Sequence, residues 1–299
     1  MTSAVLVTGG TGQLGQALAR AAWPAGWQPH VVTRADLDLA DPAAIAAMVA
    51  SRPWAAVINA GAYTGVDKAE SDQLTAWQVN ALAPAALASA CAEAGIALVQ
   101  VSTDYVFAGN KEGAWDVDDP VAPLGVYGAS KLGGELAVRT SGARYAIVRT
   151  AWVVSADGHN FVKTMLRLAA ARDELSVVDD QIGSPTSADD LAAALITVAV
   201  RLAGDAAASG TYHFSNAGAV SWAGFAAEIF RQSALRGGPS AQVVPIATAQ
   251  YPTPARRPTN SQLSHRAIGG TFGIAPRPWQ IALADILDAL IDPLDRIPA

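Results

Sequence analysis

Short hydrophobic runs alternate with longer helical segments through the first half of the chain. The runs are continuously apolar, which is typical of strands in a parallel sheet that is covered on both faces. Five of them are predicted as strands, at residues 4–8, 30–33, 55–60, 97–103 and 145–151. The alternation of strand and helix predicts right-handed βαβ units. The expected fold class is therefore α/β, with a doubly wound parallel sheet of the Rossmann type.

The segments between these runs carry the end signals of helices. Asp41 followed by Pro42 provides an N-cap residue and a proline at the first helical position, where the missing N–H needs no partner. Gly95 follows an alanine-rich segment and is typical of a helix C-terminus. We therefore expect helices between the strands.

The regular alternation ends near residue 151. Loops rich in Gly, Pro and Ser follow at residues 179–186 and 252–264, as in a smaller region with irregular connections. This change predicts two parts, residues 1–150 with the sheet and residues 151–299 with the irregular region. A helix near residues 188–203 is expected to return to the first part.

Length and composition indicate a globular protein. The chain has 299 residues, of which 51% are hydrophobic, enough to bury a sizeable core. Its formal net charge is −6 and it has no run of Lys or Arg, so neither a nucleic acid nor an anionic membrane is an expected partner. The longest uncharged apolar run, near residues 191–200, is about half the length of a membrane span.

The compartment expected from the sequence is the cytoplasm. The first residues lack the basic start and the cleavage site of a signal peptide. The single cysteine, Cys91, cannot form an internal disulfide, which suits a reducing compartment. Its place in an alanine-rich segment favours a packing role.

A glycine-rich loop follows the first strand and opens a helix. It reads Thr-Gly-Gly-Thr-Gly-Gln-Leu-Gly at residues 8–15. In this context a dinucleotide pyrophosphate can approach bare backbone at Gly9 and Gly12, and amides of the helix N-terminus face its phosphates. Glycines alone are also common in turns, but the strand before and the helix after favour a cofactor. Residues 1–150 are thus a predicted dinucleotide-binding domain, and residues 151–299 a mainly substrate-binding region.

The end of the second strand bears on the choice of cofactor. Arg34 stands where an NAD enzyme usually places an acid on the ribose hydroxyls and an NADP enzyme a cation on the 2′-phosphate. Arg34 therefore favours NADPH. Asp36 and Asp38 follow closely and can hydrogen-bond adenosine instead, so NADH stays an alternative. Residues 59–62, Asn-Ala-Gly-Ala, end the third strand with small side chains that let the nicotinamide half lie against the backbone.

Tyr127 and Lys131 form a Tyr-x-x-x-Lys pair, which places both side chains on one helical face. A nearby ammonium stabilises a phenolate, so we expect Lys131 to lower the pKa of Tyr127 toward neutrality. Tyr127 is then a candidate general acid for a carbonyl oxygen that receives hydride at its carbon. Thr103 ends the fourth strand, where open α/β sheets bind ligands, and can donate to the same oxygen. Such pairs also occur by chance on helix surfaces, but the glycine loop and Thr103 favour catalysis.

Six further motifs resemble those of the dTDP-4-dehydrorhamnose reductase family, an extended short-chain dehydrogenase/reductase family. They are Val-Ser-Thr-Asp-Tyr-Val-Phe at 101–107, Val-Tyr-Gly-Ala-Ser-Lys-Leu at 126–132, Val-Asp-Lys-Ala-Glu at 66–70, Arg-Thr-Ala-Trp at 149–152, Gln-Ile-Gly-Ser-Pro-Thr at 181–186 and Tyr-Pro-Thr-Pro-Ala-Arg-Arg-Pro at 251–258. The resemblance implies NADPH-dependent reduction of the 4-keto group of dTDP-4-dehydro-β-L-rhamnose to dTDP-L-rhamnose. That reaction is the last step of dTDP-rhamnose biosynthesis for cell-surface polysaccharide.

The resemblance also implies roles for individual residues. The implied catalytic set is Thr103, Tyr127 and Lys131. The implied cofactor contacts, besides Tyr127 and Lys131, are Gly12, Gln13, Leu14, Asp38, Leu39, Ala60, Gly61 and Ala62. The implied sugar site contains Asp104, Tyr105 and Trp152, together with Thr103.

Several of these residues have other interpretations. A deoxyhexose has an apolar methyl group and flat faces, so Trp152 beside a carboxylate such as Asp104 makes a suitable wall. Trp152 can equally be a core residue just past a strand, and residues 66–68 a solvated helix start. Arg256 or Arg257 can hold a diphosphate, because a guanidinium fork fits phosphate oxygens. The sequence does not decide between them.

Two rival functions share these motifs. A sugar-nucleotide epimerase or dehydratase has the same glycine loop and Tyr/Lys pair but retains its NAD through the catalytic cycle. A non-catalytic module, such as the regulatory subunit of methionine adenosyltransferase, resembles the same reductases. The presence of Thr103, Tyr127 and Lys131 together argues for an enzyme.

No metal is expected. Four scattered histidines and one cysteine give no transition-metal pattern. Some reductases of the resembled family use glutamates to hold magnesium at a dimer interface, and the corresponding positions here are Ala17, a position near Asp189, and Ala289 beside Asp288. One or two carboxylates would hold magnesium weakly. We therefore predict a monomer or a metal-independent dimer.

Overall fold

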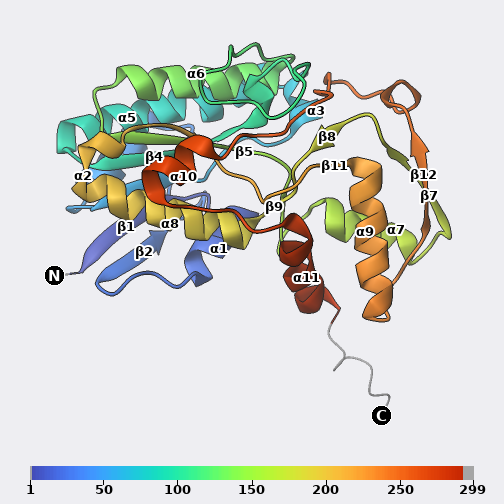
Figure 1. Ribbon diagram of the computed structural model, residues 1–299. Coiled ribbons are helices and arrows are strands. Elements are labelled where there is room, and N and C mark those ends of the chain that lie inside the picture. Colours follow the sequence, from blue (N-terminus) through green and yellow to red (C-terminus); the bar gives the residue numbers. More distant parts are fainter. Residues whose placement is uncertain (1, 292–299) are drawn as a thin grey trace.

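Six parallel strands form the central sheet. The computed structural model describes residues 2–291. The strands of this sheet are β1 Ser3–Thr8, β2 Trp27–Val31, β3 Ala56–Asn59, β4 Ala97–Thr103, β5 Tyr145–Thr150 and β10 Gly210–His213. They lie in the order β10-β5-β4-β3-β1-β2, and every neighbouring pair is parallel (Figure 1). The predicted doubly wound α/β fold is confirmed.

Helices cover both faces of the sheet. One face packs against α1 Gln13–Arg20 and α8 Ala188–Gly204, and the other against α2 Pro42–Ala50, α5 Ala83–Ala94 and α6 Val126–Thr140. Successive residues of a strand point to opposite faces. Val5 and Val7 therefore join one core cluster and Leu6 the other, and all three are fully buried. This two-sided burial is the reason why the inner strands of the sheet are mainly apolar.

A smaller lobe lies beside the sheet, at the right of Figure 1. Its helices are α7 Phe161–Ala169, α9 Trp222–Leu235 and α11 Trp279–Leu290. Its strands form three pairs, β7 Glu174–Val178 with β12 Gln242–Ile246, β6 Val153–Val154 with β9 Thr186–Ser187, and β8 Ile182–Gly183 with β11 Val220–Ser221. This lobe has its own apolar cluster, which includes Val162, Phe225 and Leu283.

Shorter helices complete the structure. They are α3 Val66–Ala69, α4 Gln73–Trp77, the π-helical η1 Gln78–Leu82, α10 Arg266–Phe272, and the 3-10 turns η2 Asp104–Val106, η3 Ala206–Ala208 and η4 Thr248–Gln250. Among residues 2–291, no helix is both long enough and apolar enough to cross a membrane.

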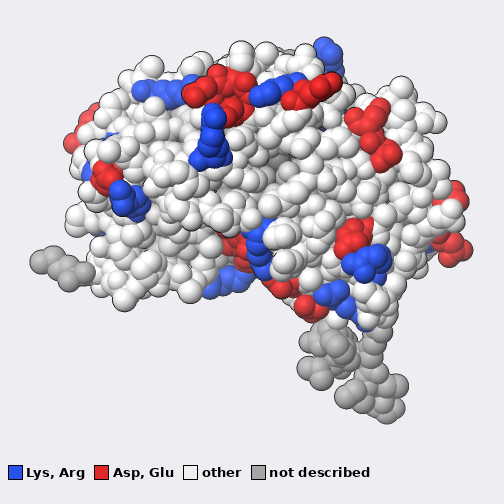
Figure 2. All heavy atoms as spheres, in the orientation of Figure 1, with Lys and Arg blue, Asp and Glu red and all other residues white. Residues whose placement is uncertain are grey.

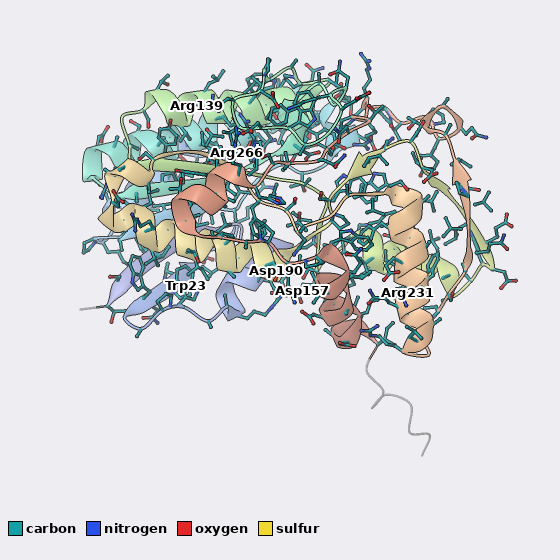
Figure 3. The ribbon with its side chains drawn as sticks, viewed as in Figure 1. Trp23, Arg139, Asp157, Asp190, Arg231 and Arg266 are labelled. Carbon is teal, nitrogen blue, oxygen red and sulfur yellow. The ribbon has the colours of Figure 1, made fainter. Side chains whose placement is uncertain are left out.

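The second half of the chain returns to the sheet. Helix α8 contacts α1 and the strands β3, β4 and β5, and β10 pairs with β5. Ion pairs join the lobes between Arg20 of α1 and Asp157 and between Asp190 of α8 and Arg277, and Arg20 also pairs with Asp189 of α8. Figure 3 labels Asp157 and Asp190 where the sheet meets the smaller lobe. The boundary predicted at residue 150 stays a prediction.

In the central sheet, β2 and β10 differ most from the sequence-based expectation, while the ends of β1, β3 and β5 differ by one residue. Strand β2 begins at Trp27, three residues before the predicted start. The prediction missed these residues because Gln28 and Pro29 interrupt the apolar run. Pro29 is tolerated there because β2 is an edge strand, where one side of the backbone needs no partner. Strand β10, with the sequence Gly-Thr-Tyr-His, is the opposite edge and was not predicted, because it is short and not continuously apolar.

The predicted helix ends are confirmed. The Asp41 carboxylate accepts hydrogen bonds from the backbone amides of Ala43 and Ala44 at the start of α2. Gly95 ends α5 in the left-handed conformation, with φ +68°. Cys91 of α5 is fully buried, and this burial raises the pKa of its thiol to about 12. A packing role for Cys91 is consistent with that environment.

Candidate active site

The predicted site residues come from the carboxyl ends of neighbouring strands. The glycine loop follows β1, Ala60 to Ala62 follow β3, Thr103 ends β4, and Trp152 follows β5. These strands are adjacent and parallel, so their carboxyl ends share one edge of the sheet. Open α/β sheets bind their ligands at this edge.

Glycine is required sterically where the glycine loop meets the end of β3. Gly9 has φ +77°, and a Cβ added there would lie 2.7 Å from the backbone of Gly61. A Cβ at Gly15 would overlap the carbonyl oxygen of Gly9, and one at Gly61 would lie 2.5 Å from the Leu39 side chain. The loop therefore packs directly on backbone. Gly12 is the exposed N-cap of α1 and provides no side-chain cap, so the positive end of the helix dipole is open to an anion.

The two residues after Gly12 are held by protein contacts. The Gln13 side chain accepts a hydrogen bond from Nδ2 of Asn160 at 2.9 Å and donates to the carbonyl of Val153 at 3.4 Å. Leu14 is 8% exposed and packs in the core between α1 and the sheet. Because both side chains are engaged elsewhere, the backbone of Gln13 and Leu14 is the part left for the predicted cofactor contacts, which stay predictions.

The acidic and basic residues after β2 have different surroundings. The Asp36 carboxylate accepts hydrogen bonds from the backbone amide and the hydroxyl of Thr33, and these bonds lower its pKa. Asp38 accepts from the amide of Ala40. The Arg34 side chain is 82% exposed, with its guanidinium 3.7 Å from the Asp38 carboxylate. The exposed Arg34 side chain can therefore reorient toward a phosphate, whereas the Asp36 carboxylate is held by its two hydrogen bonds to Thr33.

Thr103, Tyr127 and Lys131 come together where β4 meets α6. Tyr127 and Lys131 lie one turn apart near the start of α6. The Lys131 ammonium is buried and donates to the backbone carbonyl of Val101 in β4, at 2.7 Å. The Tyr127 ring packs edge-on against Tyr105, with ring centroids 5.4 Å apart. Helix α6 thus presents the phenol and the ammonium to the end of β4.

The acid–base properties of this trio differ in part from the expectation. Tyr127 is only partly exposed, and burial raises its pKa above the usual value of 10, while its contact with Thr103 lowers it. Burial lowers the pKa of Lys131 to about 8, and the charge of Glu135 opposes that shift. Lys131 does not lower the pKa of Tyr127 here, because its ammonium is directed at Val101. The phenol is protonated at neutral pH, as a general acid must be.

Asp104 has an incomplete hydrogen-bond shell. Its side chain is 3% exposed, and its Oδ1 accepts a hydrogen bond from the Thr103 hydroxyl at 2.9 Å. Burial raises its pKa to about 6, although Ser261 and Thr103 act in the opposite direction. Ser261 is near the carboxyl, but no hydrogen bond of good geometry reaches Oδ2 from the described part of the chain. A buried carboxylate oxygen without a partner is a natural acceptor for a ligand hydroxyl.

Tyr105 is hydrogen-bonded to Arg257, one of the two arginines between which the sequence did not decide. Arg257 donates to the Tyr105 hydroxyl at 3.1 Å and to the Asp67 carboxylate at 2.6 Å. Asp67, in α3, also accepts from the amide of Ala255, so it is not simply a solvated helix start. Arg256 is exposed, whereas the Arg257 side chain is 18% exposed. The structure therefore brings Arg257 to the predicted sugar-site residues.

Asn80 is a buried side chain near the site that sequence analysis missed. It lies in η1, accepts a hydrogen bond from the amide of Tyr63, and donates to the carbonyl of Tyr63 and to the hydroxyl of Ser130. Ser130 precedes Lys131 on α6. π-Helical turns are frequent at functional sites, but no local spacing in the sequence signals one here.

A buried ion pair lies behind the trio and was also missed. Glu135 and Arg149 are both fully buried, and Arg149 Nε and Nη2 donate to the two carboxylate oxygens at 2.8 and 2.7 Å. The Ser102 hydroxyl donates to Glu135 at 2.6 Å, and Arg139 donates from the edge of the cluster (Figure 3). His213 lies beside Arg149, and burial lowers its pKa to about 3. The cluster connects α6, β4, β5 and β10.

Trp152 packs against apolar side chains, and its predicted role in a sugar site stays a prediction. It is half-buried and contacts the apolar clusters of both lobes. Its ring stacks on that of Trp222, with centroids 3.5 Å apart and planes 11° apart. Its position after β5 is at the ligand-binding edge of the sheet.

The positions considered for magnesium are otherwise engaged. Ala17 is fully buried in the core, Asp189 pairs with Arg20, and Asp288 pairs with Arg236 at 2.6 Å. Within residues 2–291, no group of three or more His, Cys, Asp or Glu side chains could hold a metal ion. Metal independence stays a prediction.

An open cavity in the surface does not coincide with this edge. An open cavity of about 670 Å³ lies at the opposite edge of the sheet, among Trp27, Arg52, Trp54, Gly95 and Arg144. It contains none of the predicted site residues. Basic and acidic side chains are interspersed on the face in Figure 2.

Comparison with known proteins shows which family this chain resembles. The family model described as RmlD substrate binding domain matches residues 2–291. A Burkholderia thailandensis protein named dTDP-4-dehydrorhamnose reductase is 44% identical over 289 residues, covering 93% of this chain and 96% of that protein.

Two solved structures are also similar. A dTDP-4-dehydrorhamnose reductase from Clostridium acetobutylicum has a TM-score of 0.90 and 37% identity, covering 96% of this chain and 99% of that one. Another from Bacillus anthracis, in complex with NADP, has a TM-score of 0.88 and 36% identity with the same coverage. From the match along nearly its whole length, the chain belongs to the dTDP-4-dehydrorhamnose reductase family.

Proposed function

We propose that the protein reduces the 4-keto group of dTDP-4-dehydro-β-L-rhamnose to dTDP-L-rhamnose, using NADPH. The observation that carries this proposal is the convergence of Thr103, Tyr127 and Lys131 where β4 meets α6, at the same edge of the sheet as the glycine loop. Membership of the family supports the substrate class.

The residues around the glycine loop fit a dinucleotide. The tight contacts of Gly9, Gly15 and Gly61 leave backbone where side chains would otherwise stand, and the N-terminus of α1 favours a pyrophosphate. Arg34 is an exposed cation that pairs with Asp38 at 3.7 Å and can turn toward a 2′-phosphate. When bound, NADPH supplies a hydride to the keto carbon. NADH, which lacks the 2′-phosphate, is the alternative cofactor.

Tyr127 is the proposed proton donor. As the C4 carbon gains hydride and the C=O π bond breaks, the oxygen takes the proton of the Tyr127 phenol and becomes a hydroxyl. Thr103 is the proposed second donor to the same oxygen, and its hydroxyl would leave Oδ1 of Asp104, to which it donates in this structure. The Lys131 ammonium lies one helical turn away and donates to the Val101 carbonyl in this structure, so it would stabilise the remaining phenolate only after turning toward Tyr127.

The sugar and diphosphate are assigned to the side chains beyond β4 and β5. The free Oδ2 of Asp104 accepts a sugar hydroxyl, and Tyr105 and Trp152 provide flat apolar surface. Arg257 is the better candidate for the diphosphate because it contacts Tyr105, while Arg256 is exposed.

Consumption of NADPH tests the proposal. The purified protein is mixed with NADPH and the dTDP-4-keto-6-deoxysugar, and we expect one NADPH to be oxidised for each sugar reduced. Tightly retained NAD and a redox-neutral product would instead indicate an epimerase or dehydratase. Binding of the sugar without turnover would indicate a non-catalytic module.

Arg34→Ala is expected to raise the KM for NADPH and leave that for NADH unchanged. Hydrogen bonds to charged groups contribute about 1.5 to 3 kcal/mol, although the 82% exposure of Arg34 favours the lower end. Both KM values are measured at saturating sugar, with Arg52→Ala, an exposed arginine at the opposite sheet edge, as the control. Equal effects on both cofactors would show that Arg34 is only a surface charge.

We infer that the protein works in the cytoplasm and that its product serves cell-surface polysaccharide. The single free cysteine, Cys91, supports the compartment, and the family resemblance supports the use of the product. The protein is proposed to be a monomer or a metal-independent dimer. Treatment with EDTA should change neither its mass in solution nor its turnover of NADPH, and a loss of either that magnesium restores would refute this.

A further inference from the structure

Trp152 has an unusual backbone conformation. Its φ is +48°, and no other non-glycine residue between positions 2 and 291 has a positive φ. A bulky side chain in the left-handed region is disfavoured by contacts with its own backbone. Such conformations persist where the surrounding structure over-determines them, and they cluster at functional sites.

Two neighbours hold the Trp152 indole from the smaller lobe. Its ring stacks on that of Trp222, the first residue of α9, with centroids 3.5 Å apart. The backbone of Gly183 approaches the indole so closely that an added Cβ would lie 2.5 Å from Cε2 and 2.9 Å from Nε1. Gly183 in β8 pairs with Val220 in β11, just before Trp222. Both supports therefore come from one local unit.

The position of Trp152 connects this unit to the reacting groups. Thr150 of β5 is paired with Thr103 of β4. Trp152 therefore lies two residues further along the chain than the residue that faces the candidate catalytic threonine. Trp152 also packs against the cluster that contains Val106 and Phe107, which follow Thr103 along the chain. A rotation of its indole would change the apolar surface next to that strand end.

We propose that Trp222 is a positioning residue, which stacks on Trp152 and holds this indole as a fixed wall for the deoxysugar of the nucleotide-sugar substrate. The inference rests on the proposed function, because it takes the sugar to lie against Trp152. Trp222 itself acts through Trp152. The stack covers one face of the Trp152 ring, so only the rest of the ring is left to contact the sugar. The affinity for the sugar then depends on how this remaining surface is oriented.

Trp222→Leu keeps an apolar side chain but removes the stack. We expect the KM for the dTDP-4-keto-6-deoxysugar to rise about 3- to 10-fold, the range that aromatic pairs contribute, with kcat and the KM for NADPH within about twofold of wild type. Trp222→Phe retains an aromatic face and should restore most of the difference. In the near-ultraviolet circular dichroism spectrum, Trp222→Leu should lose the signal of the coupled indole pair.

A merely structural role would give another pattern. Trp54→Leu is the matched control, because Trp54 is 4% exposed and lies at the opposite edge of the sheet; it should lower the melting temperature without raising the KM for sugar. In a Trp152→Leu background, Trp222→Leu should add no further rise in KM. An unchanged KM in Trp222→Leu, or independent effects of the two substitutions, would overturn the proposal.

Failure of the proposed function can be distinguished from failure of this inference. A wild-type protein that does not reduce the sugar refutes the function. The affinity of each variant for dTDP-L-rhamnose, measured by calorimetry, then replaces KM as the test of Trp222. A wild-type protein that neither turns over nor binds these nucleotides refutes both.

Discussion

Tyr127→Phe is expected to lower kcat at least about 100-fold and to leave NADPH binding nearly intact. The substitution removes the transferable proton but little contact area, and acid catalysis is typically worth about 10²-fold or more. Because burial keeps the Tyr127 phenol protonated, the loss should be similar across the neutral pH range. Steady-state kinetics give kcat, and fluorescence titration gives the affinity for NADPH.

Tyr145→Phe is the matched control for this experiment. Tyr145 begins β5, at the end of the sheet opposite the site, so its hydroxyl should be dispensable for turnover. A Tyr127→Phe protein that retains more than about a tenth of the wild-type kcat would end the general-acid assignment. Lys131→Met should weaken both turnover and cofactor binding, since Lys131 is implied in both.

Glu135→Leu is expected to lower the free energy of unfolding by about 3–5 kcal/mol, because it leaves the charge of Arg149 buried without a partner. Both side chains are fully buried, and Arg149 donates two hydrogen bonds to Glu135. The double variant Glu135→Leu/Arg149→Met removes both charges and should lose much less. Urea denaturation gives the free energy of unfolding for each variant.

An exposed ion pair provides the comparison. Arg201 and Asp205 form an i, i+4 pair with side chains 60% and 36% exposed, so Arg201→Ala should cost no more than about 1 kcal/mol. If Glu135→Leu costs as little as Arg201→Ala, the buried pair does not stabilise the junction of α6 with β4 and β5. A double variant as unstable as the single one would show that packing, and not charge, is responsible.

Local sequence was sufficient for features whose signals lie within a few residues. The mainly apolar run at residues 97–103 predicted β4 with the ends that the structure has, because a strand buried on both faces is rich in apolar residues. The caps at Asp41 and Gly95 were predictable because each acts on backbone groups two to four residues away. The candidate trio was also recognisable, because i, i+4 spacing and a strand end are local patterns.

Tertiary structure alone decided the contacts between distant segments. Arg257 reaches Asp67 and Tyr105, and Trp222 stacks on Trp152, only because the smaller lobe folds back onto the sheet edge. The direction of the Lys131 ammonium depends on the Val101 carbonyl of a neighbouring strand, which no spacing on α6 reveals. Such contacts are set by how elements pack, and packing joins residues whose separation along the chain carries no periodic signal.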